Sequence, residues 1–195
     1  RRMLAYLQSK YLAGSQKIEP PVLIPETGFY DPAQEAAFEN FEDYRQFKIA
    51  KGRWKQEGAI AVLVIQQSFW ITRDLKVIDA QIEALEKVGL NPVTVFGDHG
   101  NKVGELIVSA KPDILIEDRH GGTWESNEFL KKLDIPYLRP ISMLGSTVEE
   151  WQADPMGMSP RDIGLFMSLQ ESWGTIEPIV VGGLKANIQG FRLHE

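Results

Sequence analysis

Two of the three histidines in the sequence each follow an apolar run that predicts a buried strand. His99 comes after residues 92–96, and His120 comes after residues 113–117. An imidazole can bind a divalent metal of borderline softness or carry a proton near neutral pH. Carboxylates close to His120 could complete a ligand set or accept protons. We therefore predict that a ligand or substrate contacts this region, and the candidate residues are His99, Glu117, Asp118, Arg119, His120 and Glu125.

The same residues also allow a purely structural interpretation. Asp118 and Arg119 could pair with each other or with neighbours, while His120 caps a loop. No H-E-x-x-H pattern or other established metal spacing is present. Three serines in predicted loops have no assignable base, and they are Ser68, Ser142 and Ser146. We accordingly assign neither catalytic residues nor metal ligands.

The elements that must position these residues alternate between strand and helix. Continuous apolar runs rich in β-branched residues predict strands buried on both faces, and the stretches between them have helical periodicity. This alternation with short links is typical of an α/β fold with a doubly wound, mostly parallel sheet of the Rossmann or flavodoxin-like type. The predicted strands are residues 59–65, 92–96, 113–117 and 136–141, and the predicted helices are residues 72–88, 101–110 and 126–133.

This fold has a consequence for the two histidines. Ligands of an open parallel sheet bind outside the carboxyl ends of the strands, because loops and helix N-termini converge there. His99 and His120 both follow such ends. We therefore expect the two imidazoles at one common rim of the sheet.

The segment before this core has a different pattern. Residues 3–12 predict a short helix, and a proline-rich connector follows that cannot be continuous helix. Asp31-Pro32 then opens a second predicted helix, in which aromatic residues recur every three positions. We interpret this stripe as a helix face packed on the core rather than as a ligand site. Its members are Phe38, Phe41, Tyr44 and Phe47.

After the core, residues 146–149 fit a capping box, Ser159-Pro160 starts a further helix, and residues 179–183 predict a short strand. The chain begins and ends inside patterned stretches, so we expect it to be an internal piece of a longer protein. The predicted division is a helical, proline-rich N-terminal segment of residues 1–57, an α/β core of residues 58–145 and a C-terminal helix and strand in residues 146–195.

Composition and motifs exclude several classes of function. The chain has 21 Lys and Arg against 27 Asp and Glu, with no basic cluster, so we predict no nucleic-acid partner. No apolar stretch approaches the roughly 20 residues that cross a bilayer, and the absence of cysteine excludes disulfides and thiolate metal sites. Neither a G-x-G-x-x-G fingerprint nor a P-loop is present, which argues against dinucleotide and ATP binding. This composition suits a cytoplasmic protein.

Several blocks in a fixed order carry a family resemblance. They include KPDILIED, LDIPYLRPISMLGSTVEEW and GMSPRDIGLFMSLQESWGTIEPIVVGG, with PPVLIPETGFYDP before them. From Gly58 to Gly183 these blocks resemble the large subunits of class I chelatases, which include the cobaltochelatase large subunit and the magnesium chelatase H subunit. The order and spacing of the blocks make the resemblance specific, rather than any single block.

The resemblance implies an internal α/β module of the tetrapyrrole-binding large subunit of an ATP-dependent metal chelatase, inactive as an isolated piece. It implies a corrin or porphyrin as substrate and Co²⁺ or Mg²⁺ as the inserted ion, with no cofactor bound by this piece itself. The implied partners are motor-type ATPase subunits, which hydrolyse the ATP, and other domains of the same large subunit.

One detail limits what the resemblance transfers. His120-Gly121-Gly122 is only superficially similar to the family's H-G-[ST] signature, so we carry over no catalytic role. We favour cobalt insertion in cobalamin biosynthesis, because the short links resemble compact cobalamin-type sequences. The alternatives are the magnesium chelatase H subunit of the chlorophyll pathway and a non-catalytic scaffold or docking module.

Overall fold

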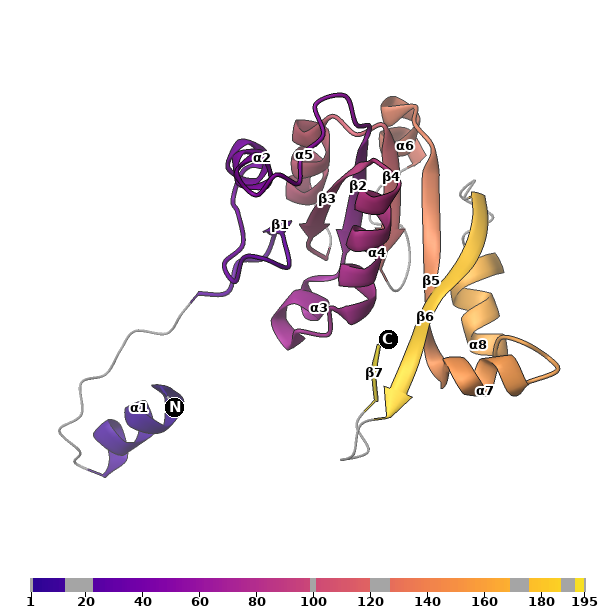
Figure 1. Cartoon of the computed structure of the whole chain (residues 1–195). Coiled ribbons are helices and arrows are strands. Elements are labelled where there is room, and N and C mark those ends of the chain that lie inside the picture. The colour runs from indigo at the N-terminus through magenta and orange to yellow at the C-terminus, as the bar shows by residue number, and fades with distance from the viewer. Residues whose placement is uncertain are drawn as a thin grey trace.

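The computed structural model describes residues 2–12, 23–98, 101–119, 127–168, 176–186 and 192–194. They form one sheet with helices around it, and the N-terminal helix lies apart from them (Figure 1). The strands are β1 (Gly28–Tyr30), β2 (Ile60–Ile65), β3 (Asn91–Phe96), β4 (Ile114–Asp118), β5 (Tyr137–Thr147), β6 (Ile176–Ala186) and β7 (Arg192–His194). The α-helices are α1 (Arg2–Tyr11), α2 (Phe41–Ala50), α3 (Gln67–Thr72), α4 (Lys76–Lys87), α5 (Asn101–Ala110), α6 (Asn127–Leu133), α7 (Val148–Ala153) and α8 (Pro160–Ile163), and a π-helical turn, η1 (Gly164–Ser168), follows α8.

The strand order in the described sheet is β1-β3-β2-β4-β5-β6-β7. β2 pairs in parallel with β3 on one side and with β4 on the other, and β5 and β6 continue the parallel series. β1 and β7 lie antiparallel at the two edges. The predicted α/β fold with a doubly wound, mostly parallel sheet is therefore confirmed. The sheet also takes strands from both segments that flank residues 58–145.

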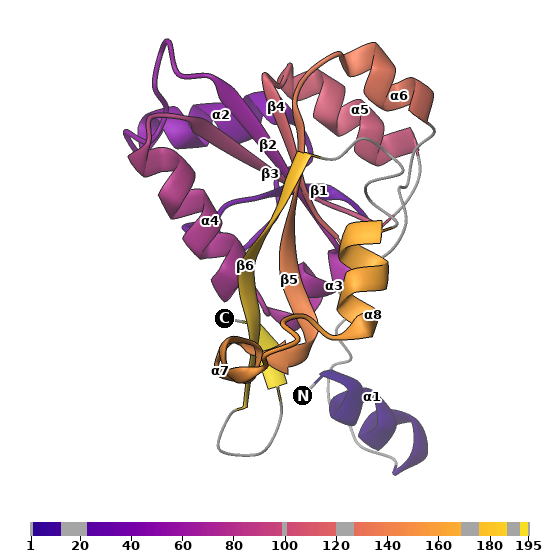
Figure 2. The same cartoon turned by 90° about the vertical axis from the view of Figure 1, so that its right-hand side faces the viewer.

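The central strand β2 is buried on both faces because alternate side chains point to opposite sides of a strand. Val62 and Val64 join a buried cluster with side chains of α2, α5 and α6. Leu63 and Ile65 join a second cluster with side chains of α3 and α4. Figure 2 shows α4 on one side of the sheet and α5 and α6 on the other. No helix in the described part of the chain is long and apolar enough to cross a membrane.

The predicted helix of residues 72–88 is wrong at its start, because two helices occupy the region after β2. Arg73 adopts a left-handed backbone conformation (φ 61°) and separates α3 from α4. α3 buries the rings of Phe69 and Trp70, and the Trp70 ring stacks on Phe96 with centroids 4.7 Å apart. The break allows these rings to stay on the sheet while α4 runs back along it.

The second predicted helix begins later than Asp31-Pro32. Residues 28–30 form the unpredicted strand β1, and α2 begins after its N-cap residue, Asn40. The Asp31 carboxylate accepts a hydrogen bond from the Ala33 N–H at 2.9 Å, which stabilises a turn instead of a helix. The aromatic stripe is confirmed as core packing, with ring contacts among Phe29, Phe38, Phe41, Tyr44 and Phe47.

The C-terminal strands are longer than predicted. β5 continues to Thr147 instead of ending at Ile141, and β6 extends beyond residues 179–183 at both ends. The capping box lies one residue later than predicted, because Thr147 Oγ1 accepts from the Glu150 N–H at 3.1 Å and Glu150 Oε2 accepts from the Thr147 N–H at 2.8 Å. The helix start at Ser159-Pro160 is confirmed. α7, α8 and η1 pack on β5 and β6 around a third buried cluster of Ile141, Met143 and Phe166.

A buried ion cluster attaches the N-terminal segment to the core. Lys48, fully buried on α2, lies 3.5 Å from Asp31 Oδ2 and also pairs with Glu86 on α4. Arg53 binds Asp31 Oδ1 and Glu86 Oε1, each at 2.8 Å. Burial alone would raise the pKa of Glu86, but the hydrogen bonds from Arg53 and Lys48 outweigh it and lower that pKa. The cluster holds two positive and two negative charges.

We expect Glu86→Gln to lower the free energy of unfolding at pH 7 by about 2 kcal/mol, because it leaves a buried excess of positive charge. The lowered pKa of Glu86 means that its stabilisation is present above its ordinary pKa of 4.5 and is lost as the pH falls through the folded-state value. Urea unfolding at pH 7 and at pH 3 to 4 measures both effects. The variant should lose less stability on acidification than the parent chain.

Glu83→Gln is the matched control, since Glu83 lies on the same helix but is 67% exposed and pairs with Lys87 across the helix surface. Its effect should be small at both pH values. Equal losses for the two variants at pH 7 would contradict a stabilising role of the buried cluster.

Candidate functional site

The carboxyl ends of the three central strands lie at one level. Ile65 at the end of β2 faces Phe96 of β3 on one side and Asp118 of β4 on the other. The loops that follow these strands therefore start side by side at the same edge of the sheet. The order of the strands reverses at this place, which is where doubly wound sheets bind their ligands.

Hydrogen bonds to Asp98 connect these three loops. The Gln67 N–H, just after β2, donates to Asp98 Oδ1 at 3.2 Å. Arg119, just after β4, donates through Nη1 to the backbone oxygen of Asp98. Asp98 itself follows β3 by two residues. The relative positions of the loop starts are thus fixed by polar contacts and not only by strand pairing.

A buried carboxylate lies under these loops. Glu117 is 1% exposed, and its Oε1 accepts a hydrogen bond from Arg119 Nε at 2.9 Å. Arg119 Nη2 lies 2.7 Å from the same oxygen and completes the ion pair. Arg139 on β5 contributes a second guanidinium, with Nη1 3.5 Å from the same oxygen. The Tyr137 hydroxyl donates to Glu117 Oε2. We call these four residues the Glu117 cluster, and its members are Glu117, Arg119, Tyr137 and Arg139.

Protonation in the Glu117 cluster follows from its burial. Burial lowers the pKa of Arg119, and the nearby Glu117 carboxylate opposes this change. Burial and the same carboxylate raise the pKa of Tyr137, so its hydroxyl stays protonated and can donate.

The Glu117 cluster also connects two strands. Arg139 Nη2 donates to the backbone oxygen of Arg119 at 2.7 Å. The cluster therefore holds the strand end of β4 against β5.

Asp118 lies on the other face of the sheet, as the alternation along β4 requires. It is 2% exposed, and its Oδ2 accepts from Gln81 of α4 at 2.7 Å and from Ser142 of β5 at 3.0 Å. Glu117 and Asp118 are adjacent in sequence, but their carboxylates do not form one site. Within the described part of the chain, no group of three or more His, Asp or Glu side chains could hold a metal ion.

The sequence of the whole chain is similar to those of known proteins. The family model for CobN/magnesium chelatase matches residues 1–194. This chain belongs to the CobN/magnesium chelatase family. The magnesium-chelatase H subunit of Chlorobaculum parvum is 25% identical over 94% of the chain, and the chloroplastic magnesium-chelatase subunit ChlH of Oryza sativa subsp. indica is 25% identical over 93%.

A solved structure has the same fold. The catalytic subunit of cobaltochelatase from Mycobacterium tuberculosis matches with a TM-score of 0.73 and 18% identity over 100% of this chain. This member of the CobN/magnesium chelatase family spans 16% of that catalytic subunit, and 16% and 15% of the two magnesium-chelatase relatives.

Three of the six predicted site residues fall in the described part of this family member. Glu117, Asp118 and Arg119 lie at the expected edge, but all three are buried and engaged by protein groups. Arg119 pairs with its neighbour Glu117. Their contact with a ligand stays a prediction. The other three predicted residues, His99, His120 and Glu125, lie outside the described residues.

Sequence reasoning missed the partners of these residues. Tyr137 and Arg139 stand in a predicted buried strand, where a charged residue is a usable signal because unpaired charges are almost never fully buried. Gln81 gave no signal, since a polar residue on a helix face is ordinary. Asp98 was only part of a loop in the sequence, and its role depends on the alignment of three strand ends.

Replacing Glu117 by Gln should lower the free energy of unfolding by about 3–5 kcal/mol, because two buried guanidinium groups lose their counter-charge. Urea unfolding at pH 7 measures this loss. Glu128→Gln, at an exposed position on α6, is the control and should change stability little. If both variants unfold at the same urea concentration, the Glu117 cluster does not stabilise this edge.

Proposed function

We propose that the chain is an internal α/β module of the tetrapyrrole-binding large subunit of an ATP-dependent metal chelatase. The observation that carries this proposal is the family match over residues 1–194, in a chain that spans only 16% of a curated relative. The fold likeness to a cobaltochelatase catalytic subunit over the whole chain supports it. The cytoplasm is the proposed location.

Metal insertion sets clear chemical requirements. A base must remove two pyrrole protons, and ligands must replace water around the incoming ion. Glu117 and Asp118 are held by buried partners, so neither carboxylate is available without breaking those contacts. We therefore propose that His99 and His120, which follow β3 and β4, are the proton acceptors or ion ligands that this module contributes.

The second part of the proposal is the identity of the inserted ion and its macrocycle. We favour Co²⁺ and a corrin, with ATP hydrolysed by separate motor-type subunits. The match to two magnesium-chelatase subunits favours the second candidate, Mg²⁺ and a porphyrin. Supplying the intact large subunit and its ATPase partners with each ion and its macrocycle separates the two, because only the true pair should give ATP-dependent insertion.

Binding by the chain itself tests whether the module contacts substrate. The chain has five tryptophans, so titration with a corrin or a porphyrin should quench their fluorescence. We expect a dissociation constant on the order of micromolar, corresponding to about 8 kcal/mol of binding free energy. Unchanged fluorescence up to millimolar macrocycle would instead support a scaffold that does not touch the substrate.

The histidines can be tested in the intact large subunit. His99→Ala combined with His120→Ala should reduce the insertion rate at least about 100-fold, the usual effect of removing a positioned acid or base. His194→Ala on β7 changes the third histidine of the chain and should leave the rate near that of the parent. An unchanged rate in the double variant would remove these residues from the proposed chemistry.

A further inference from the structure

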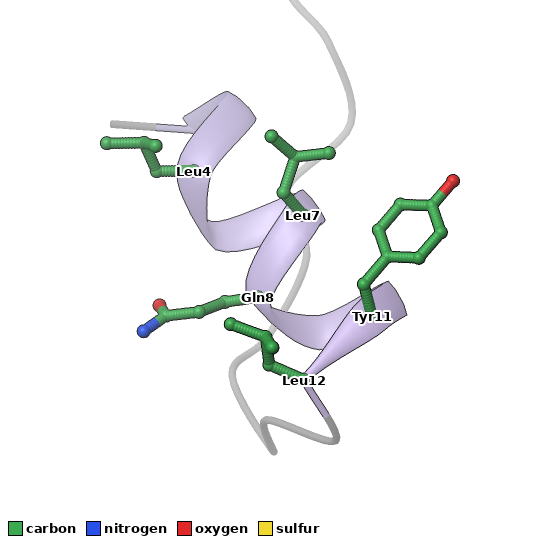
Figure 3. Close-up of a pocket in the computed structure, with 5 residues that line it drawn as sticks. All are labelled: Leu4, Leu7, Gln8, Tyr11 and Leu12. Carbon is green, nitrogen blue, oxygen red and sulfur yellow. The ribbon is translucent and has the colours of Figure 1, made fainter.

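The N-terminal helix α1 has an apolar face that other described elements do not cover. Leu4, Leu7, Tyr11 and Leu12 follow the spacing of one helix face, and their exposed fractions are 64%, 42%, 68% and 75%. Figure 3 shows these side chains around a shallow groove that Gln8 also lines. Four large apolar side chains along one short helix and the residue after it form a patch that usually marks an interaction site.

The position of α1 adds a second observation. In Figures 1 and 2 the helix lies apart from the sheet and its covering helices, beyond the carboxyl ends of the strands. A helix of ten residues is marginally stable in water, and helices in proteins gain most of their stability from packing of the apolar face. The helix therefore needs a surface that the described part of this chain does not supply.

The charge of this segment indicates the chemistry of that surface. Residues 1–12 contain Arg1, Arg2 and Lys10 and no acidic residue, so they carry a charge of +3. A partner surface that is apolar at its centre and bordered by carboxylates would match α1 in both respects.

We propose that α1 docks its apolar face into such a carboxylate-bordered groove, formed by another region of the same large subunit. This inference rests on the proposed function, and the length of the relatives supports it, since this chain spans only 16% of the magnesium-chelatase H subunit of Chlorobaculum parvum. Within one polypeptide the effective concentration is high, so a small contact suffices. A separate copy would need to bury about 800 Å² per partner, which a ten-residue helix does not provide by itself.

Hydrogen exchange of the α1 backbone amides tests this docking. In the intact large subunit these amides should exchange at least about tenfold more slowly than in the 195-residue chain, because two or more buried apolar side chains hold the helix in place. Leu7→Asp in the intact large subunit should abolish this slowing. Leu7→Met, which keeps an apolar side chain, should retain it, and so should Ser9→Asp, which adds the same charge away from the apolar face.

Three results would overturn the docking proposal. They are equal exchange rates in the intact large subunit and the short chain, slowing in the short chain that grows with its concentration, and slowing in the intact large subunit only when anionic phospholipid vesicles are added. The second result would identify another copy as the partner, and the third a membrane surface. None of them depends on macrocycle binding or metal insertion, so failure here is distinguishable from failure of the proposed function.

Discussion

The carboxylate of Glu117, buried between two guanidinium groups, constrains the whole carboxyl edge of the sheet. Its removal from water is tolerable only because Arg119, Arg139 and the Tyr137 hydroxyl replace the lost hydration. The same contacts determine where the chain goes next. Arg119 binds the backbone of the loop after β3, and Arg139 binds the backbone of Arg119. The Glu117 cluster thus joins β4 and β5 to the loop that follows β3.

The attachment of β1, at one lateral edge of the sheet, depends on a second buried group of charges. β1 is only three residues long, too short to hold the N-terminal segment by strand pairing alone. Asp31 directly follows it and is held by Arg53 and Lys48, while the preceding Tyr30 donates to Asp79 of α4 at 2.7 Å. Such buried pairs also disfavour alternative registers of β1, because a shifted register would leave charges unpaired in the core.

Features with a local physical signal were predictable from the sequence, and features set by distant contacts were not. The β-branched apolar run around Val62 predicted a strand buried on both faces, and the alternation of such runs with helical stretches predicted the fold class. The break at Arg73 involves neither glycine nor proline, and it accompanies the stacking of the Trp70 ring on Phe96, a contact between residues far apart in the sequence. The capping box was predicted one residue too early, because Ser146 and Thr147 can both cap a helix and each is followed by a glutamate three residues later. The pairing of Asp31 with Arg53 joins residues with no local link.

The same physics decides where chemistry can occur on this module. Glu117 is buried with Arg119 and Arg139, and Asp118 is buried with Gln81 and Ser142 on the other face of the sheet. Exposing Glu117 to a ligand would leave two buried guanidinium groups without their counter-charge, at a cost of several kcal/mol. These buried residues therefore have a structural role, which is to fix where the loops after the strands start. The proposed function therefore assigns the reactive groups to residues that follow β3 and β4 in the sequence, while the strand ends fix where those segments start.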